Sequence, residues 1–494
     1  MMTAIKNLFT IAAQSILAQF FGLALVPFLT RLYSPDAFAL IALYQSIALF
    51  FLCVSALRYE VAVVLVRQDD EALNAAAVGV VAAVTVAALS FFLVPPLARI
   101  LMPNSLFKQL ENLFFLIPVQ IVATAVTQLS LSWFTRTNRF MAYGSYEVLS
   151  RLLTPLLQIA IGTYFSPSGA ALILGAIIGS SAVAMILLLL VFRTGILPEA
   201  LSMKRMSVIA KQYRNLPSFM SLYSLIQTVR DSAAYFMVAA FGKQADIGYC
   251  ALASRAMVTP TSVLAGALRP VFFQRASVLG MKRTEKQIDF ALTLLGYCLV
   301  PCLVFFVLNH EWLFAFIFGA SWSAAGIYGV LVFIKAIPFC LGSWLDRSYD
   351  VLGRQPLHFA LELAYTVVAL TGFFAGAYWS GSILWGLAAY TTVSFIYYLT
   401  YLVVIYRIGG LNITLLWWAF LKWSVAAGVT LGAGYLIAIF LTGIIYVVTF
   451  AVFTAFIVAV STTLEWKKQY GQWLISVKNF HRIKNILLSR SPIS

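Results

Sequence analysis

Residues 168–192, SGAALILGAIIGSSAVAMILLLLVF, contain no charged residue, and Arg193 ends the stretch. A helix needs about 20 mainly apolar residues to cross the hydrocarbon core of a bilayer. The stretch meets that length and lacks the alternation of apolar and polar residues, over roughly ten positions, that marks a strand of a membrane β-barrel. It therefore predicts a transmembrane helix and an all-α integral membrane protein.

Runs of the same kind fill most of the chain. Fourteen of them are bounded by charged residues or by Gly, Pro and Asn, at 8–30, 37–66, 72–98, 110–135, 141–165, 168–192, 216–241, 246–274, 286–309, 324–346, 357–379, 382–406, 413–439 and 441–464. The composition agrees, because 62% of the 494 residues are hydrophobic and 10% are charged, against about 45–50% and about 25% in soluble domains. This composition excludes a soluble enzyme and a nucleic-acid-binding protein, despite the formal net charge of +16.

The Lys and Arg residues between these runs predict how the chain is oriented. With an even number of spans and both termini in the cytoplasm, the outer segments hold only Arg31, Arg99, Lys108 and Lys243. The other Lys and Arg residues outside the runs, from Lys6 and Arg67 to Arg490, lie in the cytoplasmic segments and the tail, and they are far more numerous. Positive residues collect on the cytoplasmic side of membrane proteins, so we expect fourteen spans and cytoplasmic termini.

The longest loop between spans predicts the domain organisation. Residues 193–215 are basic and divide the first twelve spans into six and six. Arg58 and Arg269 lie near the ends of the second and eighth spans, as expected for two related lobes, and many transporters bind substrate between such lobes. The predicted parts are a first lobe (1–192), a cytoplasmic linker (193–215), a second lobe (216–410), two extra helices (411–464) and a basic tail (465–494). Two alternatives stay open for the tail: an amphipathic helix on anionic lipid, or a solvated segment.

Four short motifs resemble one bacterial family. They are LRYEVAV at 57–63 with RQDDEA at 67–72, WFTRTNRF at 133–140, YRNLPSF at 213–219, and IGYCALA at 247–253 followed by Pro260. Together they resemble the O-antigen (Wzx-type) polysaccharide flippases of the multidrug/oligosaccharidyl-lipid/polysaccharide (MOP) exporter superfamily. The resemblance covers roughly residues 1–410, and the last two spans match that family's usual extra pair.

The resemblance implies a transport activity in which no covalent bond changes. Such proteins move an undecaprenyl-pyrophosphate-linked oligosaccharide repeat unit across the bacterial inner membrane, and polysaccharide polymerase machinery is an expected partner. Two alternatives stay open: a cation-coupled multidrug exporter of the same superfamily, and a membrane polysaccharide polymerase or ligase. The short outer loops argue against the second alternative, because those enzymes usually carry a large periplasmic loop.

Ionisable residues inside the runs point to the transport path. A charge at the bilayer centre costs about 2.5–3.5 kcal/mol on insertion scales, so such residues normally face the bundle interior or a wet cavity. Cations outnumber anions among the deeper groups, which suits an anionic cargo such as pyrophosphate. Arginine binds phosphate oxygens through a planar fork of donors.

Four cations are the predicted contacts of the pyrophosphate head group. Arg255 and Arg269 lie 14 residues apart, which places them within about 40° of each other and about 21 Å apart along one helix. Arg58 would face them from the first lobe, and Lys335 is the fourth candidate.

The remaining intramembrane charges receive other predicted roles. Asp231 and then Glu362 are the candidates for coupling to a proton or Na⁺ gradient, and Glu147 and Arg151, at i and i+4, are expected to form a structural pair. On a regular helix, Arg58 and Glu60 would not share a face, and neither would Arg230 and Asp231. We expect Lys422 to extend toward the membrane surface or to meet lipid.

No cofactor is expected from the sequence. It contains no phosphate-binding Walker loop, and its three His residues fall in separate segments without metal-ligand spacing. The energy for transport would come from an ion gradient or from the membrane potential.

Overall fold

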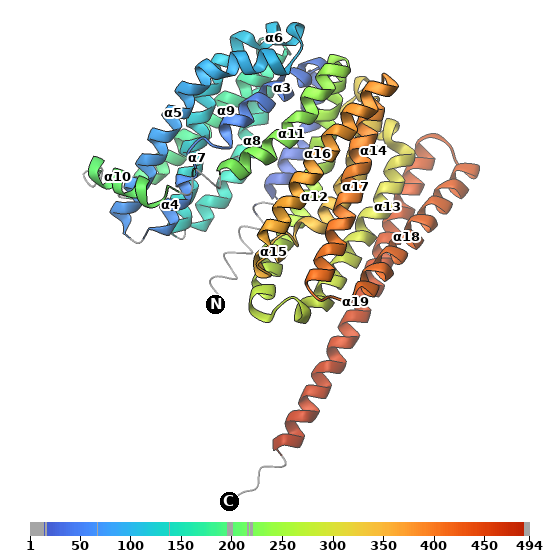
Figure 1. Ribbon diagram of the computed structural model, residues 1–494. Helices are drawn as coiled ribbons and strands as arrows, with labels where there is room; N and C mark the ends of the chain where they lie inside the picture. Colours follow the sequence, from blue (N-terminus) through green and yellow to red (C-terminus); the bar gives the residue numbers. More distant parts are fainter. Residues whose placement is uncertain are drawn as a thin grey trace, which may run out of the picture. The chain divides into compact units, whose positions relative to one another are not determined.

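The computed structural model describes residue 14 and residues 17–66, 68–137, 139–194, 201–214, 217 and 221–488. Over these residues the chain is helical and contains no strand (Figure 1). Each of the fourteen predicted runs contains helix. The start of the first run (8–13), Lys6, Arg67, part of the 213–219 motif and the last six residues of the tail lie outside the described residues.

Most helix boundaries lie near those of the predicted runs, but α13 continues to Phe318 and α19 to Leu488, well past the predicted ends at 309 and 464. The first half of the chain contains α2 (Val26–Leu32), α3 (Pro35–Leu52), α4 (Tyr59–Leu65), α5 (Asp69–Leu101), α6 (Asn104–Leu110), η1 (Glu111–Leu116), α7 (Ile117–Arg136), α8 (Phe140–Tyr164), α9 (Gly169–Phe192) and α10 (Met203–Gln212). The second half contains α11 (Ser221–Phe241), α12 (Gln244–Leu279), η4 (Lys282–Thr284), α13 (Glu285–Phe318), η5 (Ala320–Trp322), α14 (Ala325–Ser343), α15 (Ser348–Val351), α16 (Gln355–Ser380), α17 (Ile383–Ile408), α18 (Ile413–Phe440) and α19 (Gly443–Leu488).

Helix starts are fixed by side chains that cap free backbone N–H groups. The Ser34 hydroxyl accepts a hydrogen bond from the Ala37 N–H, Ser168 does the same for Ala171, and the Asn412 side chain accepts from the Thr414 N–H. Pro35 occupies the first turn of α3, where its missing N–H costs nothing. These caps set where the chain enters the second, sixth and thirteenth predicted spans.

Ten helices, or runs of adjoining helices, are long and apolar enough to cross a membrane among the described residues. The other four predicted spans are helical but more polar or shorter as described: the helix at Leu17–Leu32, α8, α11 and α12. The multi-pass membrane fold is confirmed, and the count of fourteen spans stays a prediction. The same four helices supply most of the polar residues of the cavities described below, and α3 supplies the others.

The second predicted span is broken in the middle. α3 ends at Leu52, a series of turns follows, and α4 begins at Tyr59. Leu57 and Arg58 have φ angles of 47° and 64°, in the left-handed region that costs roughly 1–2 kcal/mol for a non-glycine residue. Strained backbone of this kind clusters at functional sites and switch regions.

The chain divides into two compact units. The first comprises Met1–Val263, Glu311–Val332 and Ala364–Val393, and the second comprises Leu264–His310, Phe333–Leu363 and Ser394–Ser494. This division does not follow the predicted lobe boundaries, which stay a prediction.

In the first unit, glycines allow α9 to lie close against α8. The spacing Gly175-Ala-Ile-Ile-Gly179 is the small-residue pattern that lets transmembrane helices approach each other. A Cβ at Gly175 would meet the Gln158 backbone at 2.8 Å, and one at Gly179 would meet the Thr154 Cα at 2.9 Å. This close packing fixes the positions of Thr154 and Gln158, which line a cavity.

The second unit has an aromatic core of its own. Trp344 is buried and meets Phe272 edge to face, with ring centroids 5.2 Å apart. Tyr349, Tyr401 and Tyr406 are buried in the same cluster. The helices α18 and α19 pack on each other in this unit, and α19 continues well past the start of α18 (Figure 1).

Candidate functional site: a cationic cavity in the first unit

Two of the intramembrane arginines line a single cavity. The cavity has a volume of about 380 Å³ and lies within the first unit. Its lining residues are Gln19, Tyr146, Glu147, Ser150, Arg151, Thr154, Pro155, Gln158 and Arg255. Most come from α8, where Glu147, Arg151, Thr154 and Gln158 follow one another at the spacing of a single helix face.

The arginines of this cavity lack partners among the described residues. Arg255 and Arg151 are close enough for their charges to interact, and neither has an ion pair or side-chain hydrogen bond with a described residue. Like charges repel, and a cation buried in the membrane is costly unless it is paired. The cavity is therefore suited to an anion that both guanidinium groups can bind.

Glu147 lies on the same cavity, four residues before Arg151. Glu147 has an interaction, and Arg151 has no ion pair or side-chain hydrogen bond with a described residue, so the pairing of the two stays a prediction. The aliphatic part of Arg151 packs at Gly22, where an added Cβ would lie 3.4 Å from the Arg151 Cδ. The guanidinium end of Arg151 thus stays available to a ligand.

A second cavity adjoins the first. It has a volume of about 250 Å³ and shares Gln158 and Arg255 with the cationic cavity. Phe38, Gln45 and Tyr235 also line it. Arg255 therefore lies where a polar, basic cavity meets a more apolar one.

Arg58 lies at the break of the second predicted span. Its guanidinium donates to the Ser224 hydroxyl on α11 and forms an ion pair with Glu60, with Nη1 and Oε1 3.5 Å apart. The expectation that Arg58 and Glu60 do not share a face is wrong, because Arg58 adopts a left-handed conformation and not the regular helix that the expectation assumed. Arg58 Nε and Glu60 Oε2 are buried without hydrogen-bond partners among the described residues, so the pair retains binding capacity.

The expectation that Arg230 and Asp231 do not pair is also wrong. Arg230 Nε and Asp231 Oδ1 are 3.4 Å apart, because a long Arg side chain can reach a neighbour whose Cβ points in another direction. The Arg230 guanidinium also lies over the Tyr365 ring, 5.3 Å from its centroid. The Asp231 side chain is 67% exposed, which places it at the surface of the described protein.

Arg269 and Lys335, the other predicted head-group contacts, belong to the second unit. Both nitrogens of the Arg269 fork bind the Asp346 carboxylate, with Nε and Oδ1 2.9 Å apart. Lys335 is half-buried on α14 and interacts with another group. Arg269 is thus occupied by a carboxylate in this conformation, whereas Arg255 has no such partner among the described residues.

Glu362 lies in a cluster of aromatic and titratable residues in the second unit. It accepts a hydrogen bond of 2.9 Å from the Tyr397 hydroxyl, and His358 Nε2 lies 3.9 Å from its Oε1. The His358 ring stacks on Tyr349 at 4.8 Å, and Tyr401 lies 5.9 Å away. The exposed fractions of the His358 and Glu362 side chains are 20% and 18%, so the pair is largely shielded while remaining reachable from solvent.

Lys422 is paired with a carboxylate. Its Nζ lies 3.2 Å from Glu465 Oε2, and Glu465 is buried. The expectation that Lys422 extends to the surface or meets lipid is therefore wrong, because α18 and α19 pack on each other and bring a carboxylate within reach. A mainly apolar cavity of about 540 Å³ lies beside this pair, between α18, α19 and Tyr297.

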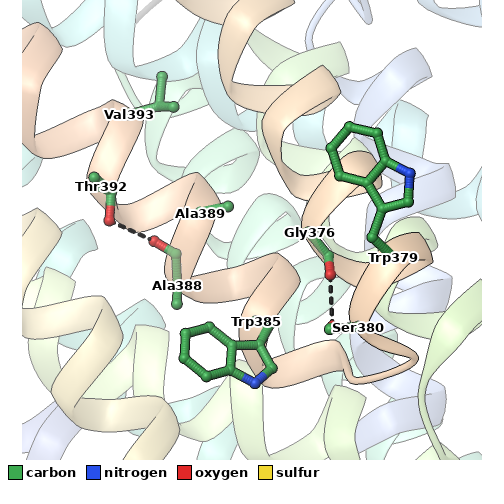
Figure 2. A pocket seen from close by; sticks show the side chains of 8 residues that line it. All are labelled: Gly376, Trp379, Ser380, Trp385, Ala388, Ala389, Thr392 and Val393. Carbon is green, nitrogen blue, oxygen red and sulfur yellow. Dashed lines mark hydrogen bonds between the residues drawn. The ribbon is translucent and has the colours of Figure 1, made fainter.

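A larger cavity, of about 590 Å³, lies between α16 and α17 (Figure 2). Small residues such as Gly376 and Ala389 form its floor, and Trp379 and Trp385 stand beside it. Both indoles are largely exposed, as expected for aromatic residues at a membrane interface. None of its described lining residues is charged, which separates it from the cationic cavity as a site for an anion.

The sequence named Arg255, Arg151 and Glu147, but it missed Gln158, Ser150 and Thr154. The signal for Thr154 and Gln158 was the row of polar residues on one face of α8, at 147, 151, 154 and 158. His358 was also missed as a neighbour of Glu362, although the two are four residues apart on one helix.

These features define a multi-pass helical membrane protein with two arginines on one interior cavity. Solved structures share the fold. The lipid II flippase MurJ in an inward closed conformation matches at a TM-score of 0.72 and 14% identity, over 94% of this chain and all of that one. An inward-facing multidrug resistance MATE family transporter of the MOP superfamily matches at a TM-score of 0.58 and 12% identity, over 80% of this chain and 96% of that one. The Vibrio cholerae MATE transporter VcmN in the bent form matches at a TM-score of 0.52 and 15% identity, over 82% of this chain and 96% of that one.

The family model described as polysaccharide biosynthesis protein matches residues 28–326. The chain belongs to this family and shares the fold of the MurJ flippase and the MATE transporter structures. None of the curated proteins matches the chain.

Proposed function

We propose that this protein flips an undecaprenyl-pyrophosphate-linked oligosaccharide repeat unit, of O-antigen or a related surface polysaccharide, across the bacterial inner membrane by alternating access. The observation that carries the proposal is the couple Arg151 and Arg255 on one cavity wall, without carboxylate partners among the described residues. A pyrophosphate diester carries about two negative charges, and each guanidinium offers it a planar fork of donors. Family membership supports a saccharide as the cargo.

In the proposed cycle, the head group enters the cationic cavity from the cytoplasm while the polyprenyl tail remains in lipid. Arg255 and Arg151 neutralise the diphosphate, and Gln158 and Ser150 supply further hydrogen bonds. Arg58, Arg269 and Lys335 would contact the diphosphate as it enters or leaves. Glu60 and Asp346 hold Arg58 and Arg269 in the present conformation, so these two cations must exchange a carboxylate for the phosphate.

Within the first unit, the helix ends that the charge pattern assigns to the outer face pack against one another and leave no opening at Trp322. Trp322 is fully buried there, and its indole N–H donates a 2.8 Å hydrogen bond to the Thr30 carbonyl. Release to the periplasmic side requires this closure to open, which is the alternating-access step of the proposal. Both termini would lie in the cytoplasm, so a polymerase partner on the periplasmic side would meet only the short outer loops.

We also propose that Glu362, and not Asp231, couples flipping to an ion gradient. Glu362 is shielded, hydrogen-bonded and next to a histidine, whereas Asp231 is exposed and paired with Arg230. The neighbouring Tyr397 hydroxyl and His358 ring favour the proton over Na⁺, because they place hydrogen-bonding groups around Glu362 and not the several oxygen ligands that a metal cation takes.

A multidrug exporter of cations is the second candidate, and the two cavity arginines count against it because they would repel a cationic drug. A polymerase or ligase is less favoured still, because those enzymes usually carry a large periplasmic loop and the predicted outer loops of this chain are short.

The test replaces Arg255 with Ala and with Lys in a host that lacks the native gene. Loss of charge-assisted hydrogen bonds, each worth about 1.5–3 kcal/mol, predicts a roughly ten- to hundredfold fall in flipping for Arg255→Ala. Arg255→Lys should retain part of the activity. Surface polysaccharide and the leaflet that holds lipid-linked repeats are measured.

Arg205→Ala is the matched control, because Arg205 is exposed and pairs with the exposed Asp70. The proposal is wrong if Arg255→Ala, at normal expression, displays normal surface polymer. Unchanged polysaccharide with altered drug sensitivity in the gene deletion would indicate the exporter, and unpolymerised repeats on the periplasmic side would indicate the polymerase.

A further inference from the structure

The smaller cavity that adjoins Arg255 has its own chemistry. Phe38 and Tyr235 contribute aromatic surfaces, and Gln45 contributes an amide. Among its described lining residues Arg255 alone is charged, and this residue is shared with the cationic cavity. With Arg255 engaged by the diphosphate of the proposed cargo, the rest of the lining offers aromatic rings and amide groups, which suits an uncharged ligand.

Hydrogen bonds to neighbouring helices fix the two amides. Gln45 Oε1 accepts a 3.2 Å hydrogen bond from Gln120 Nε2 on α7, and no described residue bonds the Gln45 amide nitrogen. Gln158 Nε2 donates a 2.9 Å bond to the Leu172 carbonyl, so its Oε1 is the end that remains for a ligand. The Gln45 amide nitrogen therefore remains as a donor and Gln158 Oε1 as an acceptor. They suit a ligand group that both donates and accepts hydrogen bonds, such as a sugar hydroxyl or acetamido group.

The order of the cavities along the helices matches the order of groups in a lipid-linked saccharide. The cationic cavity includes Tyr146 and Glu147, near the cytoplasmic start of α8 in the predicted topology. The smaller cavity reaches Leu29 and Phe38, near the predicted outer ends of α2 and α3. A diphosphate at Arg255 would therefore direct the sugar attached to it into the smaller cavity.

We propose that the smaller cavity binds the first sugar of the cargo as an uncharged ring, and that Tyr235 and Gln45 determine which sugar is accepted. The inference rests on the proposed function, because it places the diphosphate at Arg255. A volume of about 250 Å³ lies below the roughly 300–1,000 Å³ of pockets that hold drug-sized ligands. It suits one ring, so the later sugars of the repeat are not selected at this cavity.

The experiment measures binding to purified protein in lipid nanodiscs with three probes. These are undecaprenyl pyrophosphate without sugar, the same lipid carrying one N-acetylhexosamine, and the same lipid carrying one hexuronic acid. We expect the N-acetylhexosamine to increase affinity about tenfold over the sugar-free lipid, and the uronic acid to give no such gain. Gln45→Leu and Tyr235→Ala should each remove most of that gain and leave affinity for the sugar-free lipid unchanged.

Gln109→Ala is the matched control, because Gln109 is an exposed glutamine on α6 that does not line the cavity. Tyr235→Phe keeps the ring and should keep the gain in affinity. It serves as a second variant at this position if Tyr235→Ala misfolds.

Equal binding of the first two probes, or a gain that survives in both Gln45→Leu and Tyr235→Ala, overturns the sugar site and leaves the proposed flippase function intact. An equal gain from the uronic acid overturns the uncharged class of ligand. Failure of wild-type protein to bind undecaprenyl pyrophosphate overturns the proposed function and this inference with it.

Discussion

A change of one atom type at Glu362 tests the proposed coupling. Glu362→Gln removes the charge but keeps an oxygen that can accept the Tyr397 hydrogen bond. A pH difference of one unit stores about 1.4 kcal/mol per proton, a factor of about ten in distribution. We therefore expect a one-unit gradient to shift the sidedness of lipid-linked repeats about tenfold in wild-type proteoliposomes, and to have no effect on Glu362→Gln.

The control for this experiment is Asp350→Asn. Asp350 is an exposed carboxylate that pairs with Arg347 close by in the chain, outside the Glu362 cluster. It should respond to the gradient like wild type. A wild-type response to Na⁺ but not to pH, or a Glu362→Gln protein that still follows the pH gradient, would refute proton coupling at this residue.

At the scale of residues, the sequence predicted which side chains are unusual better than it predicted their partners. The cost of a charge in the membrane identified Arg255 and Glu362 from their positions inside apolar runs. The Arg58–Glu60 and Lys422–Glu465 pairs could not be predicted, because the first depends on two left-handed residues and the second on the contact of residues 43 positions apart. Such pairing is decided by backbone breaks and packing, which a regular helical wheel does not contain.

At the scale of elements, Arg136 joins three helices of the first unit. It ends α7, its Nε lies 2.9 Å from Asp69 Oδ1 at the start of α5, and its Nη1 donates to the carbonyls of Val63 and Val66 at the end of α4. Its side chain is only 10% exposed. Helix ends leave carbonyl groups without partners, and a buried cation satisfies them.

Arg136→Ala should therefore lower the free energy of unfolding by about 2–3 kcal/mol, since hydrogen bonds to charged groups contribute about 1.5–3 kcal/mol. The apparent melting temperature in detergent is the measurement. Arg205→Ala is again the control, because an exposed ion pair contributes about 0–1 kcal/mol. Equal melting temperatures for the two variants would mean that Arg136 does not hold these helix ends together.

Most elements could be predicted, because apolar length marks membrane helices strongly. Each predicted run contains helix. Residues 37–66 differ from the prediction because they form two helices, α3 and α4, and not one. Nothing in FFLCVSALRYE between 50 and 60 is a glycine or proline that would announce the break at Leu57 and Arg58. Tertiary contacts, such as the Arg58 bond to Ser224, hold that backbone in place.

At the scale of the whole molecule, the two cavities are lined mainly by helices outside the ten candidate spans of the described chain. The helix at Leu17–Leu32, α8, α11 and α12 supply Gln19, Arg151, Tyr235 and Arg255, whereas Gln45 comes from the candidate span α3. A helix can therefore be apolar enough to span a membrane and still place a polar residue on an interior cavity. The sequence could predict that charges gather inside, but the close packing at Gly175 and Gly179 decides which of them share a cavity.

Alternating access predicts that the contacts that close the outer helix ends must open during transport. A substitution at Gly248 tests this prediction. Gly248 on α12 lies directly against the Pro35 carbonyl at the start of α3, and an added Cβ would clash with that oxygen. A backbone carbonyl cannot turn aside as a flexible side chain does, so Gly248→Ala should force these helix ends apart. We expect several-fold faster labelling of a cysteine placed at the buried Ala37 by a maleimide that does not cross membranes, together with slower flipping.

Gly266→Ala is the matched control on the same helix, because a Cβ there meets nothing within 4 Å. It should label and flip like the parent protein, from which the five native cysteines have been removed. If Gly248→Ala also labels like the parent, the close contact with Pro35 does not hold the outer ends shut. If it labels faster yet flips at the parent rate, the closure opens without limiting transport, and the slow step lies elsewhere in the cycle.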